Sequence, residues 1–415
     1  MAQEPPLLAP RPPEPAPPAP EAPQPRPPAS YYASSRVGAG SALVHEQAAA
    51  FWGVQPFEEF LKNPLQWGPF QLRPFGSYRF TYGNGLNVTP GNQVTTALHE
   101  IAPGAVLQSQ HLSFRYSPTI KYYSAEEFED GVDHAASVGA NFGVNDWTFS
   151  LGHSFSDTKS PMIETGAQTP QQTHSTVLSA AYQYSNKTSF EFSLSQSIQE
   201  ADALNSSIGW SSMNWANYHW TEKTLIGLGV GGGYTKQDFG DDMTNEQLQG
   251  RIAWHPSAKL NLSLNGGVEF RQFVSSDLDD QVNPIFGASI NYSPWEPTTF
   301  SLGANQSTGA SLLEAQTTET ISFNVGVRQR LLEVLHLGLF AGYQQLEYQG
   351  YAGTGSGGLQ EDRTDEILSY SVDLGFTIFT KGEISLFYQR SENDSNAEEF
   401  SYDSDQYGFQ LAYHF

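Results

Sequence analysis

Apolar and polar residues alternate along most of the chain with a period of two, and the last stretch, Asp405–Phe415 (DQYGFQLAYHF), shows this most clearly. One face of an extended strand there carries Tyr407, Phe409, Leu411, Tyr413 and Phe415. The other face carries Gln406, Gly408, Gln410, Ala412 and His414. Because successive side chains of a strand point to opposite faces, this pattern predicts a strand with one apolar side and one small, polar side.

The same alternation recurs from Leu72 to the C-terminus in about eighteen segments, an even number as a single-chain bacterial barrel requires. Examples are Tyr78–Tyr82, Leu112–Ser117, Val138–Gly143, Phe190–Ser195, Leu260–Asn265, Ile321–Arg328 and Ser369–Phe376. The pattern predicts an all-β fold, a transmembrane antiparallel up-and-down β-barrel whose apolar side chains face lipid and whose polar side chains face water. The first two segments, 72–84 and 92–102, are the least regular, and without them the barrel would have about sixteen strands.

The connections between these segments alternate in length. Tight turns are expected at Asn145-Asp146, Asn186-Lys187, Thr221–Glu222, Pro256–Ser257, Pro294–Glu296, Leu331–Leu332 and Lys381-Gly382. Longer polar connections are expected at Ser124–Glu129, Asp157–Gln171, Glu200–Asn205, Asp238–Asp242, Ser275–Asp280, Thr308–Glu314, Gly350–Asp362 and Ser391–Phe400. Outer-membrane barrels have short periplasmic turns and long extracellular loops, so a periplasmic C-terminus places every tight turn in the periplasm.

Aromatic residues gather at the same tight turns. Tryptophan and tyrosine favour a membrane interface because the ring is apolar while its N–H or O–H needs water. We therefore predict a periplasmic aromatic girdle that consists of Trp147, Trp220, Trp254, Trp295, Tyr413 and Phe415.

The N-terminal part differs from the rest of the chain. Residues 1–30 hold half of the 26 prolines, and proline fixes φ and removes a hydrogen-bond donor, so a disordered periplasmic arm is expected there. This arm is either a spacer or a segment that reaches peptidoglycan or a periplasmic partner. Residues 31–71 predict short helices, at Ser41–Gln55 and Pro56–Leu61, which either pack on the barrel rim or enter the lumen as a plug. The barrel itself is expected over residues 72–415.

Composition narrows the class of protein. The 415 residues carry a net charge of −24, contain no cysteine and have a mean hydropathy of −0.42. No run of about twenty apolar residues is present, so helical membrane spans are excluded. A soluble all-β sandwich or propeller is the alternative, but outward aromatic residues on so many strands favour the barrel. Without cysteine there is no disulfide framework, thiolate metal site or cysteine-linked lipid, and without a basic stripe nucleic acid is not an expected partner.

Candidate chemistry is confined to the predicted inner face. Candidate pore-lining residues with a charge are Arg79, Arg115, Glu191, Arg251, Glu269, Arg328 and Asp373. They either line a constriction that tunes selectivity or form pairs that brace the wall. Trp215 is a candidate inward tryptophan, and the glycines at 227, 229 and 231 would leave room for water or a plug.

Clusters of carboxylates occupy the long connections, as at Glu126–Asp130 and Asp238–Asp242. Oxygen ligands of this kind bind Ca²⁺ or Mg²⁺, but no EF-hand spacing occurs, and a solvated acidic mouth that attracts cations is favoured, with no metal site. The pairs His153-Ser154 and His174-Ser175 place their side chains on opposite strand faces, and no catalytic motif is present. We therefore expect no catalytic residues, no cofactor and no enzymatic activity.

The terminal LAYHF, the alternating strands and the alternating connections resemble those of Gram-negative outer-membrane porins over residues 72–415. More narrowly, PFQLRPFGSYRFTYGNGL followed by HEIAPGAVL is similar to β-barrel porins associated with exopolysaccharide export. The resemblance implies an outer-membrane channel or an accessory of polysaccharide export. Since a barrel must be exported and Met1 leads directly into Ala2-Gln3-Glu4-Pro5, we expect that a signal peptide was removed.

These observations predict a porin-like channel for passive diffusion of small hydrophilic solutes or ions, with a preference for cations. The alternative is a structural barrel with a plugged lumen that anchors a cell-envelope or polysaccharide-export assembly through its N-terminal arm. Expected partners are outer-membrane lipid and lipopolysaccharide, the barrel-assembly machinery through the C-terminal strand, and further copies of the chain in a homotrimer.

Overall fold

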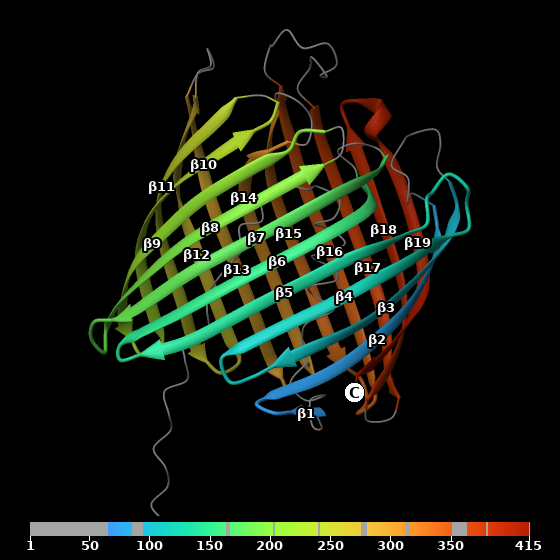
Figure 1. Cartoon of the computed structure of the whole chain (residues 1–415), viewed down its shortest axis with the longest axis horizontal. Coiled ribbons are helices and arrows are strands. Elements are labelled where there is room, and N and C mark those ends of the chain that lie inside the picture. The colour runs from blue at the N-terminus through green and yellow to red at the C-terminus, as the bar shows by residue number, and fades with distance from the viewer. Residues whose placement is uncertain are drawn as a thin grey trace, which may run out of the picture. The chain divides into compact units, whose positions relative to one another are not determined.

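The structure is a computed structural model that describes residues 65–84, 94–162, 167–201, 204–239, 241–274, 280–311, 316–350, 363–378 and 381–414. These residues are almost entirely strands (Figure 1). No helix in these ranges is both long and apolar enough to cross a membrane. The predicted arm at 1–30, the predicted helices at 41–55 and 56–61, and Phe415 lie outside the described residues.

The strands run alternately between an end with tight turns and an end with longer connections. Those that run from the tight turns are β2 (Phe70–Gly83), β4 (Leu112–Tyr123), β6 (Trp147–Met162), β8 (Thr188–Ala201), β10 (Thr224–Gln237), β12 (Leu260–Val274), β14 (Thr298–Ala310), β16 (Leu335–Gly350) and β18 (Gly382–Ser395). Those that return are β3 (Thr96–Gln108), β5 (Gly131–Val144), β7 (Ala167–Gln183), β9 (Ser207–Thr221), β11 (Asp242–Ser257), β13 (Gln281–Trp295), β15 (Gln316–Arg330), β17 (Arg363–Ile378) and β19 (Tyr402–His414). A short strand, β1 (Leu65–Trp67), pairs with the start of β2, and a 3-10 helix, η2 (Glu398–Phe400), precedes β19.

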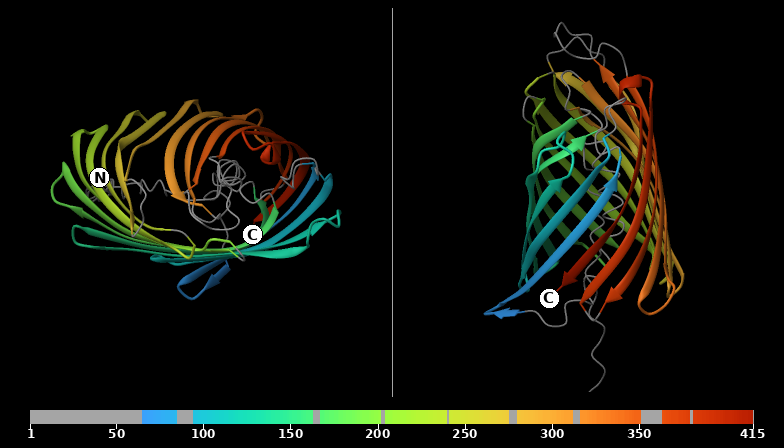
Figure 2. Two further views of the ribbon diagram at one scale, coloured as in Figure 1. Left: turned by 90° about the horizontal axis from the view of Figure 1, so that it is seen from above. Right: turned by 90° about the vertical axis from the view of Figure 1, so that its right-hand side faces the viewer.

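Each strand from β2 to β18 pairs antiparallel with the next, and β19 pairs with β2, so eighteen strands close into a barrel. The view from above shows an oval ring, with β4–β8 along one long side and the later strands along the other (Figure 2). The predicted antiparallel barrel of about eighteen strands is confirmed, and the sixteen-strand alternative is wrong because β2 and β3 belong to the ring.

The closing seam between β19 and β2 extends from Gln406 opposite Gly83 to His414 opposite Phe75. On its outer side, aromatic rings meet across the seam: the ring of Phe409 lies 5.8 Å from that of Tyr78 and 5.6 Å from that of Phe80. Asn84 extends the seam, since its side-chain Oδ1 accepts a hydrogen bond of 2.8 Å from the backbone N–H of Asp405. The C-terminal alternation therefore supplies one half of the closure.

Several strands extend further than the alternation indicated. β3 covers Thr96–Gln108 instead of 92–102, and it continues past Pro103 because the β3–β4 ladder is interrupted there, opposite Pro118. β6, β7, β14 and β18 likewise extend into stretches predicted as connections. The reason is that backbone ladder bonds continue where the side chains on both faces become polar.

The register places apolar side chains outside and polar side chains inside, as the alternation predicts. Outward side chains such as Leu228 and Val230 on β10 are 61% and 55% exposed, while their neighbours Gly227, Gly229 and Gly231 face the lumen. The polar inner wall is therefore the surface on which function has to be sought.

Candidate functional site

The seven predicted lining residues occupy inward register positions on seven different strands. Arg79 lies opposite Gln410, Arg115 opposite Ser137, Glu191 opposite Trp215, Arg251 opposite Gly227, Glu269 opposite Gln247, Arg328 opposite Thr299 and Asp373 opposite Gly338. Among them, the structure brings Glu191 and Arg251 into direct contact and places Arg328 in the electrostatic surroundings of Asp373. The others are distributed around the ring, and their role in selectivity stays a prediction.

Arg251 on β11 is the centre of the best-defined polar cluster. Its Nη2 lies 2.8 Å from Glu191 Oε1 and donates to Asn217 Oδ1 at 2.7 Å, while its Nε donates to the same oxygen at 3.0 Å. Asn217 in turn donates to Glu191 Oε1 at 3.0 Å. The guanidinium also lies 4.3 Å from the ring centroid of Trp215, a cation–π contact. Three strands, β8, β9 and β11, thus contribute to one fixed group on the wall.

The glycines of β10 make this cluster fit. A Cβ at Gly227 would lie 2.6 Å from Asn217 Oδ1, and a Cβ at Gly229 would lie 2.7 Å from Trp215 Cε3. The sequence suggested that these glycines leave free space for water or a plug, and this is wrong. Side chains from β9 and β11 occupy the space next to the glycines.

A second cluster lies nearer the long-connection end. Arg271 donates from Nη2 to Glu269 Oε1 at 2.6 Å, and Gln247 donates to Glu269 Oε2 at 2.6 Å. Both charged side chains are buried, at 5–6% exposure. Arg271 Nη2 also donates to the backbone oxygen of Thr308 at 3.2 Å, although β13 lies between β12 and β14 in the ladder.

The ends of β14, β15 and β16 therefore bend into the lumen. The β13–β14 ladder ends at the Gly287–Asn305 pair, although both strands continue. Thr317 occupies an outward register position on β15 and is nevertheless only 1% exposed. Asn205, in the β8–β9 connection, donates to the oxygen of Ser311 at 3.3 Å and to Gln237 Oε1 at 2.6 Å. We call this part, residues 306–311, 316–319 and 346–349, the inward flap; the view from above shows these strands entering the ring (Figure 2).

The remaining predicted residues have nearby partners. Arg79 lies 3.9 Å from Glu100 and 4.3 Å from the ring centroid of Phe387. Arg115 lies over the ring of Phe75 at 4.8 Å.

Alternation alone did not single out several inner-wall groups. Lys121 pairs with Asp133 and donates to Ser160 Oγ at 2.8 Å. His336 Nε2 lies 3.0 Å from Glu383, and Arg363 pairs with Asp365 at 3.0 Å. Each of these residues occupies a polar position on the predicted inner face, so the alternation could have indicated it as a lining residue. Only the register between strands shows which strand supplies its acidic partner.

An apolar cluster also faces the lumen, on β16, β17 and β19. Leu346, Tyr348 and Ile367 are each 1% exposed and Tyr402 is 8% exposed. Arg363 lies between the rings of Tyr348 and Phe400, at 3.9 Å and 3.7 Å. Phe400 belongs to η2, so the β18–β19 connection covers part of this cluster from inside the ring.

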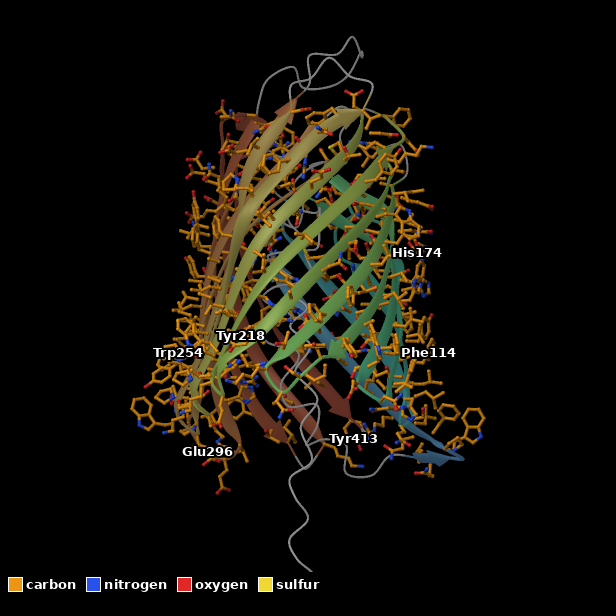
Figure 3. The ribbon with its side chains drawn as sticks, turned by 90° about the vertical axis from the view of Figure 1, so that its left-hand side faces the viewer. Phe114, His174, Tyr218, Trp254, Glu296 and Tyr413 are labelled. Atoms are coloured by element: carbon orange, nitrogen blue, oxygen red, sulfur yellow. The ribbon has the colours of Figure 1, made fainter. Side chains whose placement is uncertain are left out.

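The five predicted girdle residues that the structure describes lie at the tight-turn end. Trp220, Trp254 and Trp295 are 68%, 42% and 64% exposed, and Trp147 stacks on Tyr182 with ring centroids 4.7 Å apart. Trp254, Tyr218 and Phe114 lie at similar low levels on the barrel, and Tyr413 lies lower still (Figure 3). Trp67 on β1 is 70% exposed at the same end and was not predicted.

Within the described ranges, no group of three or more His, Asp or Glu side chains is arranged to hold a metal ion. Several inward acidic side chains instead contact an inward basic one, as in Lys121–Asp133, Arg251–Glu191 and Arg271–Glu269. Exposed carboxylates gather at the long-connection end, where they include Glu126, Glu127, Asp238 and Glu398.

Comparison with known proteins gives one family match. Residues 255–415 match the family described as "Putative beta-barrel porin 2". No curated protein sequence matches the chain.

Several solved barrels are similar in structure. The copper transporter OprC has a TM-score of 0.45 at 9% identity, covering 81% of this chain and 65% of its own. Pseudomonas aeruginosa OccK2 in complex with glucuronate has a TM-score of 0.44 at 11% identity, covering 83% of this chain and 97% of its own. Pseudomonas aeruginosa OccK7 has a TM-score of 0.45 at 14% identity, covering 84% and 99%. This chain thus spans just under two thirds of the length of OprC.

The family match begins near the end of β11 and runs through β19, which is the part that closes on β2. Together with the closed ring of eighteen strands, this match supports the predicted resemblance: residues 255–415 are similar to a β-barrel porin family, and they form part of an antiparallel barrel.

Proposed function

We propose that the protein is a passive outer-membrane channel for small hydrophilic solutes or ions, and that it prefers cations. The observation that supports this function most is the inner wall, where Ser, Gly, Asn, Gln and paired charges replace the apolar residues of the outer face. Such a wall suits water and small hydrophilic solutes.

The inward flap supplies a constriction in this proposal. It narrows the lumen at the long-connection end, where Arg271 and Asn205 donate hydrogen bonds to the end of β14 and the residue after it. Because several acidic groups of the wall are paired with basic ones, we attribute the preference for cations to the exposed carboxylates of the mouth.

The test is single-channel conductance of the refolded full-length protein in a planar bilayer, under a salt gradient. Steady steps with a reversal potential displaced toward the cation's equilibrium potential are expected. A protein that is folded in the bilayer and carries no current would overturn the channel. Conductance steps whose reversal potential is not displaced would support the proposed channel but contradict the proposed preference for cations.

We also propose a second candidate, a structural barrel with a partly filled lumen, because the inward residues Leu346 and Ile367 are each 1% exposed. Apolar side chains gain nothing from facing a water-filled pore, so their burial favours a covering segment. Removing residues 1–64, which leaves β1 in place, distinguishes the candidates. A filled lumen predicts a higher conductance or the loss of an envelope partner after removal, whereas an open channel predicts unchanged steps.

A further inference from the structure

The outer face of β6–β9 carries polar side chains among large apolar ones such as Leu178 and Leu194, which are 51% and 44% exposed. On β9 the outward side chains between Tyr218 and Trp210 are Ala216, Asn214 and Ser212, and none of the three is a large apolar residue. On β6 and β7, His153, Thr176 and His174 also point outward. We call the outward residues His153, His174, Thr176, Gln196, Ser212 and Asn214 the polar patch.

The patch lies at the depth of the hydrocarbon. Asn214 is four residues from both Tyr218 and Trp210, or about 13 Å along the strand in each direction. Since the apolar band of an outer-membrane barrel is about 25 Å tall, Asn214 falls near its middle. Figure 3 shows His174 on the outside of the wall, above the level of Phe114 and Trp254 and below the upper rim.

Hydrogen bonds within the patch satisfy it only in part. His153 Nδ1 and Thr176 Oγ1 lie 2.9 Å apart, and Asn214 Nδ2 donates to Ser212 Oγ at 3.1 Å. His174 contacts the rings of His153 and Phe155 at 5.8 Å and 4.8 Å, and among the described residues its ring nitrogens have no hydrogen-bond partner. Lipid tails offer neither donors nor acceptors, so these groups gain from a protein partner.

The opposite wall has a different character. On β13–β17 the outward residues line an apolar groove of about 480 Å³, formed by side chains such as Ile290, Leu302, Phe323, Val325 and Leu368. That surface suits acyl chains directly. The polar patch is therefore a feature of one side of the barrel and not a general property of its outer face.

We propose that the polar patch packs against the same patch of a second copy of this chain. All copies insert in the same orientation, so any symmetry axis that relates them runs along the membrane normal and preserves depth. The patch of one copy thus meets polar groups of the other at matching depth, and it contains both donors and acceptors. Small outward residues also occur there, namely Ala180, Ser212, Ala216 and Gly232, and small residues are common where membrane-spanning elements pack together.

Cysteine cross-linking tests this interface cleanly, because the chain has no cysteine of its own. Thr176→Cys and Ser212→Cys place a single thiol in the patch. Leu302→Cys and Val325→Cys are matched controls on the opposite wall, where the native side chains are 47% and 41% exposed. Each purified full-length variant is reconstituted into liposomes at a high lipid-to-protein ratio and treated with a bifunctional maleimide.

Cross-linked dimer is expected from the two patch variants at a yield at least fivefold above that of the controls. Equal yields from both walls, or no dimer from the patch, would overturn the proposal. A heat-modifiable shift on electrophoresis shows that each variant is folded, and the readout does not depend on conductance.

A double variant, Ser212→Leu with Asn214→Leu, provides the independent measurement. It replaces two polar groups by apolar side chains that suit lipid, so we expect the barrel to fold. We expect the dimer population to fall at least tenfold, as counted by single-molecule photobleaching. An unchanged dimer population in the folded double variant would contradict the proposed interface. If this variant does not fold, the same count on Thr176→Val decides in the same way.

Discussion

At the scale of single residues, the inner wall is organised by neighbours across strands and not by neighbours along the chain. Glu191, Asn217 and Arg251 are far apart in sequence, yet their side chains form one hydrogen-bonded group above the glycines of β10. For these charges the sequence leaves two alternatives open, a selective lining or a braced wall, and the contact between Glu191 and Arg251 favours the braced wall. A pair braces the wall and contributes little net field.

Removing the cation of this pair should therefore expose the anion. In Arg251→Gln, Glu191 remains as an uncompensated carboxylate in the lumen. A unit charge at about 4 Å contributes about 1 kcal/mol in a water-like dielectric, so the cation-to-anion permeability ratio is expected to rise by about fivefold. Reversal potentials under a salt gradient measure this ratio. The control is the double variant Glu191→Gln with Arg251→Gln, which should return it toward wild type; a single variant without any shift would contradict the assignment.

At the scale of elements, two devices shape the barrel: the seam that closes it and the flap that enters it. The seam depends on close backbone approach at Gly408, where a Cβ would lie 1.8 Å from the oxygen of Phe80. The flap depends on hydrogen bonds that Asn205, in the β8–β9 connection, and Arg271, on β12, donate to the end of β14 and the residue after it. Both involve strands whose alternation is ordinary, so neither is visible in the pattern of the individual strand.

The seam gives a stability prediction. Gly408→Ala forces the backbones of β19 and β2 apart, and overpacking of this kind costs about 1–3 kcal/mol. A lower urea midpoint for unfolding from lipid vesicles is expected. Gly76→Ala on β2 is the matched control, because nothing lies within 4 Å of a Cβ built there. Equal midpoints for the two variants would show that the seam tolerates the extra atom.

The flap gives a prediction about channel noise. Asn205→Ala removes the hydrogen bonds to Ser311, Gln237 and Phe239, so the end of β14 loses one of its attachments. Single-channel records are expected to show more frequent transitions and a higher mean conductance. Asn265→Ala serves as the control, since Asn265 bonds Gln249 on the wall and is not attached to the flap. Identical records for Asn205→Ala and wild type would rule out the flap as the constriction.

At the scale of the whole molecule, charge is distributed unevenly. The chain has a net charge of −24, whereas several charges of the described inner wall are paired with opposite ones, so the excess negative charge lies outside these pairs. Exposed carboxylates at the long-connection end are the groups that approaching ions meet first. Their field extends about 10 Å at 0.1 M salt and about 3 Å at 1 M.

Neutralising the mouth should thus reduce cation preference in a salt-dependent way. The variant with Glu126→Gln, Glu127→Gln, Asp238→Asn and Glu398→Gln is expected to bring the permeability ratio closer to one at about 0.1 M salt and to change little at about 1 M. Reversal potentials at both concentrations make the comparison. If the ratio is unchanged at the lower concentration, selectivity has to come from the wall.

Much of the fold was predictable from the sequence, and the strand ends and side-chain partners were not. Alternation identified the strands and their faces because it is a local property of the extended backbone. It ended several strands too early, as at Asp157 on β6, because ladder bonds continue above the lipid where both faces are polar. It assigned Glu191 and Arg251 to the inner face, but it did not indicate that Asn217 hydrogen-bonds both of them.

The alternation along the chain is enough to predict strands with one apolar face toward lipid, and the turn residues are enough to predict antiparallel strands with alternating short and long connections. These properties follow from the period of two and from turn residues, which act within a few positions. The tertiary structure alone decided how β19 meets β2, which charges pair, why β10 is rich in glycine, and that the ends of β14–β16 enter the lumen. Those features depend on the register between strands, and register is set by the closure of the whole ring.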